Sequence, residues 1–179
     1  SFHFPQYGDE DDGKVLLLDP EPFNNFASLL VSGALLFGDK SLLAGIRETD
    51  IKNIVLFGDR GRDAFAGWLP SVAPVRPSLS ADFYREEGHF IVKDTLRNGK
   101  EIYLHMDAAP LGYLSIAAHG HADALSFILH LDGLPFFIDP GTYTYHTEPQ
   151  YRHYFTGTLA HNTVRVNQSD QAMNGGPTL

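Results

Sequence analysis

The chain has 179 residues, of which 43% are hydrophobic, 12% aromatic and 20% charged, a composition that supports an ordinary globular core and excludes a disordered chain. Its formal net charge is −9 and it has no basic stripe, so binding to nucleic acid is not expected. Cysteine is absent, which excludes disulfides and thiolate metal ligands, and no apolar run approaches the roughly 20 residues that a membrane span requires.

An acidic segment, Gly8–Gly13, lies near the start of the chain. An EF-hand calcium loop needs alternating oxygen ligands and a Glu at its twelfth position. With Asp9 as the first position, the twelfth is Pro20. A solvated acidic loop is therefore favoured over a calcium site.

Residues 1–77 favour helices. Between residues 22 and 37, apolar side chains recur at intervals of three and four, which predicts an amphipathic helix. Its apolar face would consist of Phe23, Phe26, Leu29, Leu30, Ala34 and Phe37. Asp39 is placed to cap a second, short helix. Residues 51–57 are compatible with helix or strand, and the proline-rich stretch at 58–77 indicates a linker.

After Pro77 the apolar period changes to two. Residues 83–93 and 101–107 flank an Asn-Gly pair, which predicts a hairpin with a type I′ turn. The alternation at 125–131, with Leu125 on the apolar face, predicts a strand that turns at Asp132-Gly133 into a second strand at 134–138. A further short strand is predicted at 161–166. Helices followed by antiparallel strands indicate two domain fragments.

Seven of the nine histidines lie between residues 100 and 165: His105, His119, His121, His130, His146, His153 and His161. Neutral imidazoles with few neighbouring Lys or Arg suit a metal or proton-transfer site. His119 and His121 project to the same side if their backbone is extended. Zinc prefers about four ligands, and spacing alone does not choose among His119, His121, Asp123, Asp139 and His161.

The hairpin at Asp132-Gly133 constrains such a site. A strict two-residue turn would place Asp139 opposite Ser126, five residues and roughly 16 Å of strand from His121. If Asp139 and His121 share a metal, the chain must bend or bulge before Leu125.

Between residues 118 and 171 the motifs HGHADALSF, IDPGTYTY, YRHYF and AHNTV follow one another, after GD and GALLF earlier in the chain. This ordered series resembles the heparinase II/III-like polysaccharide lyases. The resemblance implies an α/α toroid followed by an antiparallel β-sandwich, with the active site in the cleft between them. Residues 1–77 would then be the last toroid helices and a linker, and residues 78–179 the first portion of the sandwich.

The resemblance implies β-elimination on a uronate-containing, anionic polysaccharide, in a periplasmic or secreted protein. Removing the C5 proton requires a neutralised carboxylate, a base at C5 and an acid at the leaving O4. In the family, the main acid and base residues lie on toroid helices upstream of this chain. The sequence, which begins with Ser1, is therefore expected to be a segment that is inactive alone.

Residue by residue, the resemblance implies a catalytic role for His119 and a zinc site formed by His121, Asp139 and His161. It implies a substrate-binding, sugar-facing role for Arg152, and makes Tyr145 and Tyr151 candidates for a catalytic tyrosine in the cleft. Asp123 has no ligand role in this pattern. Each of these side chains also has an ordinary structural interpretation, as a hydrogen-bonded, turn or packing residue.

Two other functions stay open. A non-catalytic carbohydrate-binding module could retain the same fold and zinc site. The His-x-His-x-Asp string also resembles the start of the metallo-β-lactamase signature, which would make His119 and Asp123 ligands of a metal-dependent hydrolase. However, Ala124 stands where that signature has a further histidine.

Overall fold

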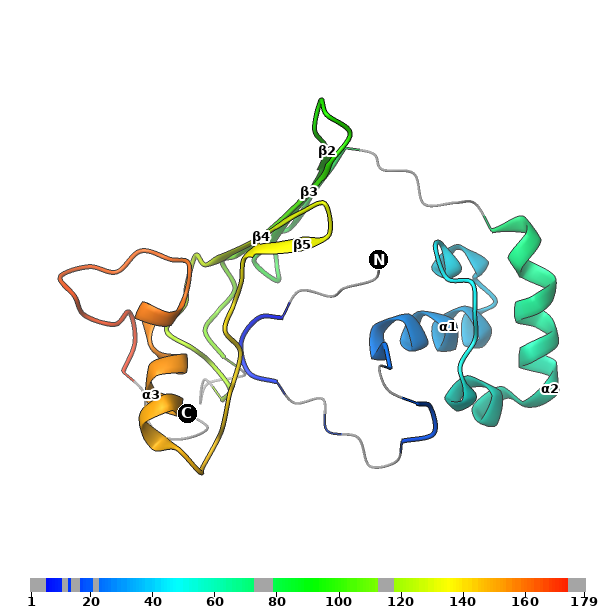
Figure 1. Ribbon diagram of the computed structural model, residues 1–179, viewed down its shortest axis with the longest axis horizontal. Helices are drawn as coiled ribbons and strands as arrows, with labels where there is room; N and C mark the ends of the chain where they lie inside the picture. Colours follow the sequence, from blue (N-terminus) through cyan, green and yellow to red (C-terminus); the bar gives the residue numbers. More distant parts are fainter. Residues whose placement is uncertain are drawn as a thin grey trace. The chain divides into compact units, whose positions relative to one another are not determined.

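The computed structural model describes residues 6–10, 13, 17–20, 23–72, 79–112 and 118–173. They form two compact units (Figure 1). The first contains the described residues between 13 and 72, and the second contains residues 6–10 together with those from 79 to 173. Among the described residues, no helix is both long and apolar enough to cross a bilayer.

The first unit is helical. α1 (Asn25–Phe37) begins at Asn24, whose side chain accepts a hydrogen bond from the Ala27 amide. The short helix η1 (Lys40–Leu43) is capped by Asp39, as predicted. α2 (Ile51–Trp68) and η2 (Leu69–Ser71) follow.

The predicted linker from Gly58 onward is wrong for most of its length. α2 continues to Trp68 across a kink at Gly58, where φ is 62° and ψ is −161°. A glycine tolerates this backbone conformation, so the helical hydrogen-bonding resumes after the kink. Residues 73–77 of the predicted linker lie outside the described residues.

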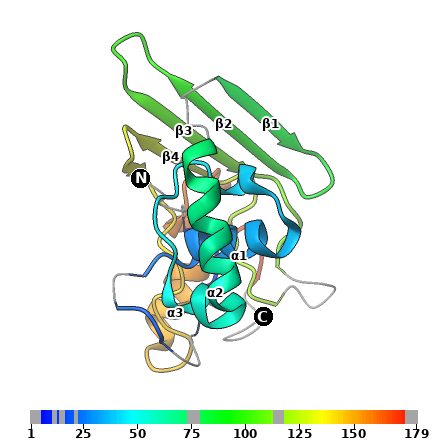
Figure 2. The ribbon, with the colours of Figure 1, turned by 90° about the vertical axis from the view of Figure 1, so that its right-hand side faces the viewer.

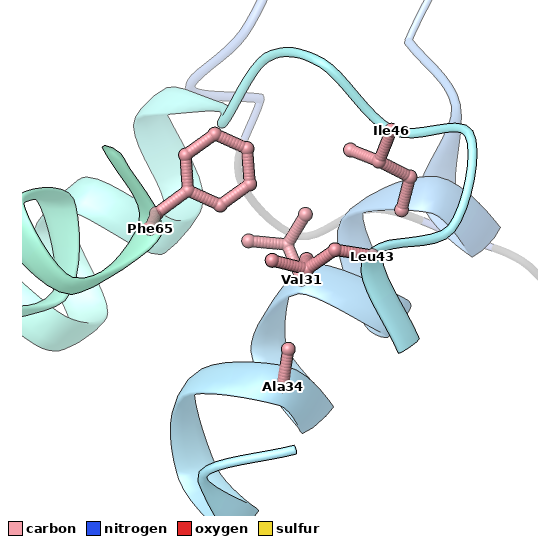
Figure 3. Close-up of a cluster of buried hydrophobic side chains, with 5 residues drawn as sticks. All are labelled: Val31, Ala34, Leu43, Ile46 and Phe65. Atoms are coloured by element: carbon pink, nitrogen blue, oxygen red, sulfur yellow. The ribbon is translucent and has the colours of Figure 1, made fainter. Parts of the chain in front are cut away.

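The core of this unit consists of buried apolar side chains from α1, η1, the following turn and α2 (Figure 3): Val31, Ala34, Leu43, Ile46 and Phe65. The predicted face of α1 is correct at Ala34, which is buried, but wrong at Phe26, Leu29 and Phe37, which are exposed. Val31, which was not placed on that face, is buried in the core. α1 is apolar on several sides, so its spacing alone could not identify the packed face.

Asn53 is a buried polar link between α1 and α2. Its Nδ2 donates to the Ser28 carbonyl at 3.0 Å and to Asp50 Oδ2 at 2.7 Å. Its Oδ1 accepts from the Ser32 hydroxyl at 2.7 Å. The side chain therefore satisfies its polar atoms within the interface that it joins.

The second unit contains a five-stranded antiparallel sheet with the order β1-β2-β3-β4-β5 (Figures 1 and 2). This confirms the predicted class, antiparallel β structure preceded by helices. The strands are β1 (Ser80–Tyr84), β2 (His89–Thr95), β3 (Glu101–Asp107), β4 (Phe127–Leu131) and β5 (Leu134–Phe137). The single strand predicted at 83–93 is in fact the end of β1, a turn and most of β2.

The glycine in that turn is required. Gly88 has φ of 80°, and a Cβ there would lie 2.6 Å from the backbone oxygen of Ala108 and from the backbone of Ala109. The first hairpin turn differs from the prediction, whereas the predicted turn at Asp132-Gly133 is confirmed. Gly99 has φ of 82° but Asn98 has no positive φ, so the first turn is not type I′. Asp132 and Gly133 both have the positive φ of that type.

The bend required by a shared metal site is present. The pairing of β4 and β5 shifts register between Leu129 and His130, and Leu125 has φ of 63° before β4 begins. Asn162 joins the two strands, because its Nδ2 donates to the carbonyls of Phe127 and Ile138. The predicted apolar face of this strand is wrong at Leu125, which is exposed, whereas Ile128 is buried.

The elements after β5 were not predicted correctly. A helix, α3 (Pro149–Thr156), and a short turn of helix, η4 (Thr158–Ala160), precede His161. The predicted strand at 161–166 is wrong, because the described residues form no strand there. An isolated β-bridge joins Val166 and Ser169 instead.

A pair of histidines lies on neighbouring strands of the sheet. His105 on β3 is buried, and its Nε2 lies 3.1 Å from Nδ1 of His89 on β2. The ring of Tyr7 packs edge-on against both. Burial is the largest cause that lowers the pKa of His105, and the charge of His89 lowers it further. The charge of Asp107 acts in the opposite direction.

Candidate metal centre and adjoining polar site

Two histidines and two aspartates from separate segments gather in the second unit. His121 and Asp123 come from the loop before β4, Asp139 follows β5, and His161 follows η4. His121, Asp123 and His161 are buried and offer ligand atoms within 4.8 Å of one another. Asp139 joins them, because its Oδ2 lies 3.0 Å from Nδ1 of His161.

The loop that contains His121 is held by side-chain hydrogen bonds to its backbone. The Thr158 hydroxyl donates to the carbonyl of Ala122 at 2.6 Å, and the Thr163 hydroxyl donates to that of Ala124 at 2.6 Å. η4 and the segment after it therefore fix the backbone on either side of Asp123.

The two ring nitrogens of His161 both face acceptors. Nε2 lies 3.0 Å from the Phe155 carbonyl, which can only accept, and Nδ1 faces the Asp139 carboxylate. Burial alone would lower the pKa of His161, but the hydrogen bond and charge of Asp139 raise it. The geometry suits an imidazolium, or a neutral ring that binds a cation together with Asp139.

One ring nitrogen of His121 has a hydrogen-bond partner and the other has none. Its Nε2 lies 2.8 Å from Oδ1 of Asp9, while its buried Nδ1 has no hydrogen-bond partner. An unsatisfied buried polar atom costs about 1–3 kcal/mol, so native structures rarely leave one without a role. A metal ion would satisfy this nitrogen, and the contact with the carboxylate resembles those that orient metal-binding histidines.

The two aspartates complete a donor set of suitable charge. Oδ1 of Asp139 accepts a hydrogen bond from the Gly141 amide at 2.8 Å, and Oδ2 faces His161. Burial raises the pKa of Asp123, against the opposing charges of His161 and His121. Two neutral imidazoles and two carboxylates balance a divalent cation, and the set fits zinc, which accepts nitrogen and oxygen ligands.

A second polar site adjoins the first through Asp9. Its side chain is only 1% exposed, and both oxygens contact the guanidinium of Arg152, Oδ2 at 2.7 Å from Nη2. Burial alone would raise the pKa of Asp9, but hydrogen bonds from His121 and Arg152 hold it well below its usual range. The prediction of a solvated loop is therefore wrong for Asp9.

His119 reaches the same carboxylate from a turn, not from a strand. It has φ of 61°, so the extended backbone assumed for the His-x-His pair is wrong. Its Nδ1 lies 3.3 Å from Oδ2 of Asp9, and its side chain is 44% exposed. His119 and His121 thus converge on one carboxylate.

The predicted cleft residues separate into two groups. The ring of Tyr145 lies 6.0 Å from that of His119 and 4.8 Å from the guanidinium carbon of Arg152, and its hydroxyl donates to the Glu10 carbonyl. Tyr151 on α3 packs instead against Tyr143, at 5.2 Å between rings. The structure therefore brings His119, Tyr145 and Arg152 together.

Sequence reasoning did not identify Asp9 as a site residue. Asp9 lies in an acidic segment, whose composition exposed loops share, and in the GD pair that begins the motif series, but the resemblance gave it no role. The contact spans 112 positions to His121 and 143 to Arg152, so no local pattern could reveal it.

Comparison with known proteins gives a consistent relationship. Residues 82–179 match the family model described as heparinase II/III-like, C-terminal. The heparan sulfate lyase HepC from Pedobacter heparinus aligns with a TM-score of 0.57 and 15% identity, over 93% of this chain and 21% of that one. A structure of heparinase III aligns with a TM-score of 0.42 and 17% identity, over 55% and 16% of the respective chains. No curated protein sequence matches.

The first of these structural likenesses supports the fold. The chain spans about a fifth of the length of HepC. About four fifths of HepC therefore have no counterpart in this chain.

Proposed function

The chain belongs to the heparinase II/III-like family, and from this premise we propose that it is a segment of a polysaccharide lyase that cleaves a uronate-containing polysaccharide by β-elimination. The observation that carries the proposal is the family match over residues 82–179, which contain all the side chains of the site except that of Asp9. The activity belongs to the full-length protein, because the main acid and base residues are expected upstream of this chain. A polymeric substrate suits a periplasmic or secreted enzyme.

In this proposal His119 and Tyr145 face the sugar. His119 is the more exposed of the two histidines on Asp9, so its ring can reach a ligand while the carboxylate orients it. It hydrogen-bonds to the uronate carboxylate or moves a proton at the reacting centre. The Tyr145 ring meets that of His119 edge-on and has the guanidinium of Arg152 over its face, and these contacts limit its orientation.

Arg152 supplies positive charge near the same place. Its side chain is 4% exposed and is paired with Asp9. A guanidinium charge at this place favours a carboxylate group on a nearby substrate. Tyr151 lies on an exposed part of α3 and provides an outer contact for the polymer.

The metal in this proposal is zinc, held by His121, Asp139 and His161, with Asp123 as the fourth donor. The unsatisfied Nδ1 of His121 and the Asp139–His161 contact support this set. Zinc supplies a fixed positive charge that joins three separate chain segments beside the sugar site. The side chains of His121 and His161 are buried, so the role of the metal is mainly structural.

The full-length protein provides the test. It is incubated with heparan-type, alginate-type and bacterial uronate polymers, and the unsaturated uronate formed by β-elimination is followed by its ultraviolet absorbance. We expect product with at least one polymer, and loss of most activity on His119→Ala but not on His153→Ala, which removes an exposed histidine from α3. Binding without product would favour the carbohydrate-binding module, and saturated ends would favour a hydrolase.

A further inference from the structure

We propose that Asp9 is a positioning residue, which orients His121 for metal binding and fixes Arg152 and His119 beside it. The inference rests on the proposed function, because that function includes a metal at His121. It concerns a residue outside the segment that matches the family model, residues 82–179.

Each carboxylate oxygen of Asp9 contacts two side chains. Oδ1 accepts from Nε2 of His121 at 2.8 Å and also contacts Arg152. Oδ2 lies 2.7 Å from Nη2 of Arg152 and 3.3 Å from Nδ1 of His119. One carboxylate therefore contacts a proposed metal ligand and two residues proposed to face the sugar.

The contact determines which nitrogen of His121 can bind a metal. An ionised carboxylate only accepts hydrogen bonds, so Nε2 must carry the proton. The lone pair of the neutral ring then lies on Nδ1, which is the buried atom with no hydrogen-bond partner. A carboxylate in this position also raises the basicity of the ring and so strengthens it as a ligand.

The segment that carries Asp9 is held against the second unit on both sides of that residue. On one side the ring of Tyr7 packs against His89 and His105. On the other, the Glu10 amide donates to the Thr142 hydroxyl. Figure 1 draws this segment in blue, beside the chain that follows β5. The carboxylate thus occupies a fixed position.

Burial makes the arrangement sensitive to the loss of Asp9. The side chains of Asp9, His121 and Arg152 are at most 4% exposed. The negative charge of Asp9 balances the positive charge of Arg152, and removing one member of a buried pair leaves the other without compensation.

Zinc affinity, measured by competition with a chromogenic chelator, tests the inference. We expect Asp9→Ala to weaken zinc binding about 10- to 100-fold, the range for loss of an outer-shell partner of a metal ligand. Asp9→Asn should weaken it less, because the amide oxygen can still accept from His121. Glu10→Gln is the matched control: it removes the same charge from an exposed neighbour and should leave zinc affinity unchanged.

Arg152→Lys separates positioning of His121 from general damage to the site. It keeps a positive charge to balance the buried Asp9 but removes the planar guanidinium, and it leaves the Asp9–His121 contact, so zinc affinity should stay much closer to wild type than that of Asp9→Ala. The inference is wrong if Asp9→Ala binds zinc as tightly as Glu10→Gln, or if Arg152→Lys is as defective as Asp9→Ala.

A measurement on the wild-type chain covers the case in which Asp9→Ala does not fold. In the cadmium-113 form labelled with nitrogen-15, we expect metal coupling to Nδ1 of His121 and an exchange-protected proton on Nε2. Coupling to Nε2 would overturn the inference. So would a wild-type chain that binds no metal, although lyase activity of the full-length protein could survive that result. Absent lyase activity with metal bound would overturn the proposed function alone.

Discussion

Zinc content should depend on a specific set of side chains, and single alanine variants can identify it. The structure gathers His121, Asp123, Asp139 and His161 from three segments. It leaves His119 44% exposed, with its Nδ1 near Asp9. We therefore expect the first four variants to lose zinc and His119→Ala to retain it.

The size of the effect follows from the number of donors. Structural zinc binding in zinc-finger peptides amounts to about 10–16 kcal/mol, or about 3–4 kcal/mol for each of four ligands. Since 1.4 kcal/mol is a factor of ten, each lost ligand should weaken binding by about two to three orders of magnitude. His121→Ala should weaken zinc binding at least as much as the other variants, because it removes Nδ1, the proposed ligand atom that has no other partner.

The assay is elemental mass spectrometry on dialysed protein, followed by chelator competition for variants that retain metal. Circular dichroism confirms that each variant is folded, and wild-type chain with added zinc should show a higher melting temperature. If zinc requires His119, the metal-dependent hydrolase replaces the lyase proposal. If folded wild-type chain contains no metal, the ligand reasoning is wrong and the carbohydrate-binding module is favoured.

Three further predictions concern stability, measured as the free energy of unfolding in urea. Gly99→Ala should cost about 1–2 kcal/mol for left-handed backbone, and Gly88→Ala clearly more, because its Cβ would lie 2.6 Å from backbone atoms; equal costs would contradict this. Asn53→Ala should cost about 2–3 kcal/mol by leaving buried partners unsatisfied, and a cost below about 0.5 kcal/mol would refute that role. The pKa of His105 is lowered in the folded state, so the unfolded state takes up its proton first as the pH falls below the usual value of 6.5. The contribution of His105 to stability should therefore decrease from about pH 7 toward pH 5. Wild type should lose more stability over this range than His105→Gln, and equal slopes would exclude this cause.

The sequence by itself determined the features that depend on neighbouring residues. The helix ending at Phe37, the cap at Asp39, β3 and the turn at Asp132-Gly133 all follow from local spacing or turn chemistry. The ordered motifs between residues 118 and 171 also identified the family, because several separate matches in one order are specific where each alone is not.

Local patterns failed where several conformations suit the same residues. Because α1 is apolar on several sides, its spacing does not identify the side that packs in the core. The glycine at position 58 made the helical pattern of α2 unrecognisable beyond the kink. The assignment of the two units to the end of a toroid and the start of a sandwich stays a prediction.

Only the tertiary structure decided how the site is assembled. The register shift in β4 and β5 and the turn at Leu125 determine where Asp139 lies relative to the histidines. Asp9 reaches His121 and Arg152 across more than 110 positions. Such contacts depend on the packing of distant segments and on the burial of charge, and neither is encoded in the spacing of adjacent residues.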